Sequence, residues 1–98
     1  MPEFTIISES RARETHQRTG RPIQHWCWVV LLNGEFYYVS WLSTSPYGDR
    51  PECMAFASDE HGNVNDWDEL SVCYCTDPRV ALRQTISALA TQPAKLAC

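Results

Sequence analysis

The chain of 98 residues has little lysine and glycine and no long apolar run. Lys95 is the only lysine and the formal net charge is −4, which disfavours general attraction to nucleic acid or to an anionic membrane. With four glycines there is no glycine-rich phosphate loop, which disfavours a nucleotide cofactor. No stretch of about 18 apolar residues exists, so no segment is predicted to span a membrane.

The opening stretch, MPEFTIISES, lacks the basic start, the apolar run and the small-residue cleavage site of a secretory signal. The five cysteines, at positions 27, 53, 73, 75 and 98, are odd in number, which argues against a disulfide framework. We therefore predict a cytoplasmic protein with reduced cysteines. Because 44% of the residues are hydrophobic, we expect one globular domain over residues 1–98, with a frayed tail at 93–98.

The clearest structural signal is Asn33-Gly34, which lies between two apolar runs and predicts a two-residue hairpin turn. This turn pairs Leu32 with Glu35, and the register continues to Trp26 opposite Trp41. Both faces of the predicted hairpin are then apolar, so we place it in the middle of a sheet. One face carries Trp26, Trp28, Val30, Leu32, Tyr37, Val39 and Trp41, and the other carries Cys27, Val29, Leu31, Phe36, Tyr38 and Leu42.

Two further strands are predicted at residues 53–58 and 71–76, and residues 78–92 form the clearest helix. Asp77 is a suitable N-cap for it and Pro78 fits its first position. Its apolar stripe comprises Leu82, Ile86 and Leu89, with Ala81, Thr85 and Ala90 beside them.

The N-terminal region is predicted to contain a short edge strand at residues 4–7 and then a helix. Ser8 or Ser10 would cap this helix, and Gly20 and Pro22 would end it. The predicted fold class is therefore α+β, a four-stranded antiparallel meander sheet flanked by an N-terminal and a C-terminal helix.

The N-terminal helix is too polar to cover the second sheet face. That face is expected to remain exposed for a partner, to be buried by a second copy, or to be covered within the monomer. In the last case the cover would come from the N-terminal strand, from the loop that contains Trp67 and from the loop after Leu42.

No strong catalytic motif is present, and we predict that the protein is not an enzyme and needs no cofactor. The three histidines, His16, His25 and His61, lie in no recognisable motif with a nucleophile, and Cys27 is interpreted as an inert strand residue. The acids of residues 59–69 do not have the spacing of a calcium loop. A zinc site built from Cys53, Cys73 and Cys75, completed by His25 or His61, stays open as an alternative.

Charge is unevenly distributed. Residues 11–21 hold four arginines and one acid, a local charge of +3, whereas residues 49–69 hold seven acids and one arginine, a local charge of −6. Arginines and loop aromatics are common contact residues in protein interfaces. The predicted partner-binding residues are therefore Arg11, Arg13, Arg18, Arg21, Tyr47, Asp59, Glu60, Asp66, Trp67, Asp68 and Glu69.

The chain is short and acidic, and SRARETHQRTGRPI leads into an aromatic hairpin that is followed by GNVNDWDEL. In these features it resembles, in general type, the small anti-defence proteins of phages and mobile elements, such as anti-CRISPR proteins. This resemblance implies stoichiometric occlusion of a surface on a host multi-subunit or nucleic-acid-binding complex. The alternatives are a homodimeric structural module that buries an apolar sheet face, and a small zinc- or ligand-binding protein. Membrane binding and direct nucleic-acid binding are disfavoured.

Overall fold

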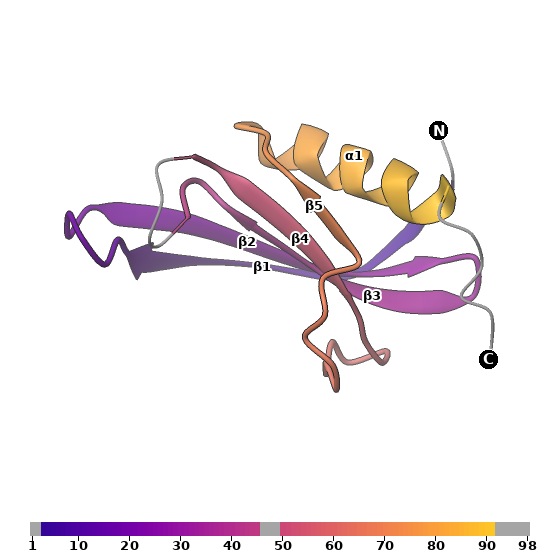
Figure 1. Ribbon diagram of the computed structural model, residues 1–98. Coiled ribbons are helices and arrows are strands. Elements are labelled where there is room, and N and C mark those ends of the chain that lie inside the picture. The colour runs from indigo at the N-terminus through magenta and orange to yellow at the C-terminus, as the bar shows by residue number, and fades with distance from the viewer. Residues whose placement is uncertain (1–2, 46–49, 92–98) are drawn as a thin grey trace.

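The computed structural model describes residues 3–45 and 50–91 and shows one antiparallel sheet with a helix on one side (Figure 1). Five strands lie in chain order, so each strand pairs with its neighbour in the sequence. The elements are β1 (Thr5–Thr15), β2 (Pro22–Leu32), β3 (Glu35–Leu42), β4 (Glu52–Ala57), β5 (Ser71–Cys73) and α1 (Pro78–Thr91).

The predicted fold class was wrong at the N-terminus. Residues predicted as a short strand and a helix form the single eleven-residue strand β1, so the sheet has five strands rather than four and no N-terminal helix flanks it. Strand pairing with β2 over Thr5–Thr15 outweighs the helix propensity of the local sequence. The polar side chains of β1 are consistent with this, because they cover aromatic rings rather than fill a core.

The turn between β1 and β2 is built around His16, which is only 5% exposed. Its Nδ1 atom accepts hydrogen bonds from the backbone N–H groups of Arg18, at 3.1 Å, and Thr19, at 3.2 Å. Gly20, which was predicted to end a helix, instead has a φ of 71° within this turn. The local stop signal was real, but it belongs to a hairpin.

The hairpin of β2 and β3 was predicted correctly. Leu32 pairs with Glu35, and the register continues to Trp26 opposite Trp41. Asn33 and Gly34 both have positive φ, 52° and 80°, as a type I′ turn requires. Since β1 pairs with β2 and β4 with β3, this hairpin occupies the middle of the sheet, as its two apolar faces indicated.

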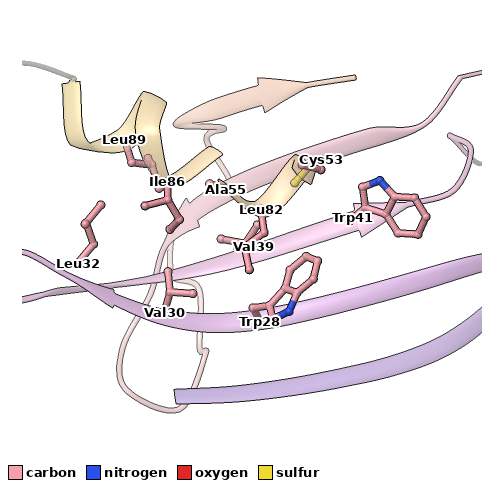
Figure 2. Packing of buried hydrophobic residues seen from close by; sticks show 11 residues of the cluster. Trp28, Val30, Leu32, Val39, Trp41, Cys53, Ala55, Leu82, Ile86 and Leu89 are labelled. Atoms are coloured by element: carbon pink, nitrogen blue, oxygen red, sulfur yellow. The ribbon is translucent and has the colours of Figure 1, made fainter. Parts of the chain in front are cut away.

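We call the sheet face that α1 covers the helix face, and Figure 2 shows its core. Asp77 caps α1 as predicted: its Oδ1 accepts the backbone N–H of Arg79 at 2.9 Å. Ile86 is fully buried over Val30 and Val39, which are also 0% exposed. The core of this face comprises Trp28, Val30, Leu32, Val39, Trp41, Cys53 and Ala55 from the sheet and Ala81, Leu82, Ile86 and Leu89 from α1.

We call the opposite side the open face; it carries Cys27, Val29, Tyr38 and Phe56, and α1 does not reach it. The loop between β4 and β5, residues 58–70, lies on this side of the sheet (Figure 1). A Cβ atom added at Gly62 would stand 2.8 Å from Val29 Cγ2, so the loop backbone packs directly on the sheet. This loop therefore covers one end of the face that the sequence left without a cover.

Candidate interaction surface

In the described part of the chain, the longer of the two exposed edges of the sheet is that of β1. All eleven residues of β1 are exposed, and the strand has a hydrogen-bonded neighbour on one side only. Its register shifts between Ile6 and Ser8, so the edge has an irregularity near its start. The other edge of the sheet is β5, which has only three residues.

The helix-face side of β1 is positively charged where it crosses the tryptophans. Arg11 lies opposite Trp26, with its guanidinium carbon 3.8 Å from the ring centroid, and Arg79 of α1 approaches the same ring at 5.5 Å. Glu9 accepts a hydrogen bond of 2.8 Å from the indole N–H of Trp28 and lies 3.7 Å from Arg11. These contacts hold the guanidinium group of Arg11 over the ring of Trp26.

Of the other predicted arginines, Arg13 lies next along β1, opposite Gln24, whereas Arg18 and Arg21 lie in or beside the β1–β2 turn. The four predicted arginines therefore all lie in the hairpin of β1 and β2, in the half that is closest to its turn. Arg13 is exposed on the same side as Arg11, since alternate residues of a strand share a face.

The predicted acidic residues lie elsewhere, in the loop on the open face (Figure 1). Asp59 accepts hydrogen bonds at 2.8–2.9 Å from His61 and Asn63, and those from Asn63 hold the pKa of its carboxyl below the ordinary value. Asp66 accepts the backbone N–H of Asp68. These two carboxylates organise the loop itself, while Glu60 and Glu69 are also exposed there.

Trp67, in the same loop, is 64% exposed although it packs edge-on against two aromatic rings. Its centroid lies 5.0 Å from that of Phe56 and 6.2 Å from that of Tyr38. The predicted contact residue Tyr47 lies outside the described residues.

The zinc alternative grouped three cysteines with a histidine. Cys53 and Cys73 do lie opposite one another in β4 and β5, on the helix face. Within the described ranges, however, no group of three or more potential ligands is positioned to hold a metal. His25 is on the open face and His61 is in the loop, so the sheet separates His25 from the cysteines.

Comparison of the chain with protein-family models, with curated proteins and with solved structures gives no match. Over residues 3–45 and 50–91, no helix has the length and apolarity that a membrane crossing requires.

Sequence reasoning missed one cluster, which lies on the open face. His25, Cys27 and Glu14, from two adjacent strands, are joined by contacts of 2.8 and 3.0 Å. The spacing His25-x-Cys27 on a strand was the available signal, because residues two apart share a face. Glu14 could not be added from sequence, since its segment was interpreted as a helix.

Proposed function

We propose that the protein is a non-enzymatic binding module that holds another protein through the free edge of β1. We expect the interaction to be strand addition, in which an extended segment of the partner continues the sheet next to β1. In this proposal the protein acts stoichiometrically in the cytoplasm. Its general resemblance to phage anti-defence proteins makes a bacterial defence complex the expected partner.

The observation that carries the proposal is the length and exposure of β1. An edge strand presents backbone N–H and C=O groups that lack partners in the sheet, and proteins usually keep such edges short or covered. The β5 edge follows this rule with three residues, whereas β1 leaves eleven exposed residues uncovered. An edge of this length provides a long row of backbone hydrogen bonds for a partner strand.

The side chains of β1 indicate the chemistry of the partner. Arg11 and Arg13 stand on the helix-face side of the edge, with Arg18 and Arg21 beyond them toward the turn. An added strand with acidic residues on that side would meet these guanidinium groups. We therefore expect an acidic extended segment in the partner.

The test is recovery of the partner from nuclease-treated bacterial lysate with wild-type protein and with an Arg11→Glu/Arg13→Glu variant, quantified by mass spectrometry. The variant is expected to lose the stoichiometric partner. A matched control is Arg50→Glu/Arg83→Glu, which makes the same charge change away from β1, because Arg50 lies over the ring of Tyr74 and Arg83 is exposed on α1, and this variant is expected to retain the partner.

Hydrogen exchange on the recovered complex then locates the interface. Amides of residues 5–15 are expected to become protected when the partner binds, while amides of β5 are not. Equal recovery with the β1 variant, together with unchanged exchange in residues 5–15, would contradict the proposal.

A homodimer is a second candidate, supported by the charge order of β1. If two copies pair antiparallel with Ser10 opposite Ser10, Glu9 of each copy faces Arg11 of the other. Light scattering after size exclusion tests this directly: a mass near twice 11.2 kDa supports the dimer, and a monomer at high concentration excludes it.

A further inference from the structure

The cluster on the open face has the parts of an activated thiol. Cys27 Sγ lies 3.0 Å from His25 Nε2, and His25 Nδ1 lies 2.8 Å from a carboxylate oxygen of Glu14. Cys27 is thus placed as a nucleophile, His25 as its base and Glu14 as the group that orients the base. The three residues come from β1 and β2, so strand pairing fixes their positions.

The contacts define where the protons lie. Because the Glu14 carboxylate accepts from Nδ1–H, the Nε2 atom of neutral His25 is left to accept a proton from Cys27. Ser40, which is 8% exposed, also places its Oγ 2.7 Å from Nε2. The ring is therefore held on both nitrogens, and Nε2 lies within hydrogen-bond distance of both the Cys27 sulfur and the Ser40 hydroxyl.

A second donor stabilises the charged sulfur. The Tyr38 hydroxyl donates a hydrogen bond of 3.0 Å to Cys27 Sγ. Burial opposes ionisation of Cys27, yet hydrogen bonds from His25, Tyr38 and Ser10 leave the pKa of its thiol below the ordinary value. The hydrogen bond with Cys27 and the charge of Glu14 raise the pKa of His25 against the effect of burial. Both shifts favour a thiolate–imidazolium pair.

The histidine contact, rather than exposure, distinguishes Cys27 from the other described cysteines, because Cys73 and Cys75 are also only partly buried. Cys27 is half-buried on the side that α1 does not cover, whereas Cys53 is fully buried and its pKa is raised to about 12, chiefly by burial. Cys73 and Cys75 also pack against the helix-face core. No second described cysteine stands on the open face to displace a group attached to Cys27.

We propose that Cys27 is a nucleophilic thiol that exchanges with low-molecular-weight disulfides and retains the attached group. The Cys27 thiolate attacks one sulfur of the disulfide RSSR, the S–S bond breaks, and a Cys27–S–S–R bond forms as RS⁻ leaves. His25 then donates the Nε2 proton to the leaving thiolate, giving RSH and neutral imidazole. The product is a stable mixed disulfide on one face of the sheet.

The experiment measures the reaction of folded protein with 5,5′-dithiobis(2-nitrobenzoate) and with oxidised glutathione between pH 5.5 and 8.5. Cys98 is replaced by serine throughout so that its thiol does not contribute. At pH 6.5 we expect one thiol to react at least about tenfold faster than the same chain unfolded in urea, because the folded site holds a larger fraction of Cys27 as the thiolate. Peptide mapping is expected to place the glutathione on Cys27.

Variants separate activation from simple exposure. In His25→Gln, Cys27 is expected to lose the fast reaction at pH 6.5, and its rate is expected to rise with pH as for an ordinary thiol. Cys53→Ser is the matched control on the helix face and is expected to keep the fast reaction. Circular dichroism of each variant establishes that it is folded.

Two results would overturn the proposal: a Cys27 rate in wild-type protein no faster than in the unfolded chain, or an unchanged rate profile in folded His25→Gln. The first needs no substitution at the cluster, so it stays decisive even if His25→Gln does not fold. Partner binding at the β1 edge is measured separately, so failure of either proposal leaves the other standing.

Discussion

The two faces of the sheet are built from the same strands but are covered in different ways. On the helix face, α1 inserts a stripe of apolar side chains, and Val30, Val39 and Ile86 are fully buried. On the open face, a polar loop lies over one end and a network of hydrogen bonds occupies the region of His25 and Cys27. Alternation along each strand therefore gives one face that is packed by α1 and another that carries the hydrogen bonds around Cys27.

The cysteines show the same contrast at the level of single atoms. Cys53 Sγ has Thr85 Oγ1 at 3.3 Å inside an apolar core, and burial raises its pKa. Cys27 is approached by His25 and Tyr38, and its pKa is lowered. The pKa of a cysteine thiol is thus shifted in opposite directions at these two positions, which lie on opposite faces of the sheet.

The largest expected effect is on the helix face. Ile86→Ala leaves a cavity in a fully buried site and is expected to lower the free energy of unfolding by about 2–5 kcal/mol. Urea denaturation measures it, and Val72→Ala, at a position 39% exposed on β5, is the control, with an expected loss under about 1 kcal/mol. Equal losses would mean that α1 does not anchor the core.

The contact between loop and open face is tested by two glycines. Gly62→Ala combines a φ of 82° with a Cβ 2.8 Å from Val29, whereas Gly20 has a φ of 71° and no atom within 4 Å of its added Cβ. We expect Gly20→Ala to cost about 1 kcal/mol from backbone strain and Gly62→Ala about 1–3 kcal/mol more from overpacking. Thermal or urea unfolding that gives equal losses would contradict the packed loop.

The aromatic contact beneath the same loop is expected to contribute less. In a double-mutant cycle, Trp67→Ala and Phe56→Leu should show a coupling of about 0.5–1.5 kcal/mol, because their rings meet edge to face at 5.0 Å. Strict additivity of the two losses would show that Trp67 stands free of the sheet and that its exposed ring is held by the loop alone.

The smallest effect concerns the ion pair on the open face. Because the pKa of His25 is raised in the folded protein, its contribution to stability is fully present below the unfolded pKa of about 6.5 and is lost as pH rises through the folded pKa. Glu14→Gln should therefore cost more at pH 5.5 than at pH 9, and under about 1 kcal/mol. Unfolding at both pH values and a proton titration of His25 by NMR measure it.

Glu60→Gln is the matched control for this prediction. Glu60 lies 3.4 Å from His61, and both side chains are mostly exposed in the loop. It is expected to leave the pH dependence of stability unchanged. A similar change in both variants would indicate a general charge effect rather than the contact between Glu14 and His25.

What could be predicted from the sequence was set by local signals. Asn33-Gly34 determined a hairpin and its register, and Asp77-Pro78 determined where a helix begins. The strand β1 could not be predicted because its residues favour a helix locally. It is stabilised by pairing with β2 and by contacts of Arg11 with Trp26 and of Glu9 with Trp28, which depend on the tertiary structure. The site around Cys27 was missed for the same reason, since Glu14 joins it only after β1 pairs.

The position of α1 in the chain has a consequence for biosynthesis. A ribosome completes β4 before it has made any of the helix that covers the apolar side of the sheet. At about 5–20 residues per second, the interval between Ala57 and Leu89 is roughly 2–6 seconds. During that time the chain has Trp28, Val30 and Val39 but not the helix that covers them, and exposed apolar strands of this kind promote aggregation.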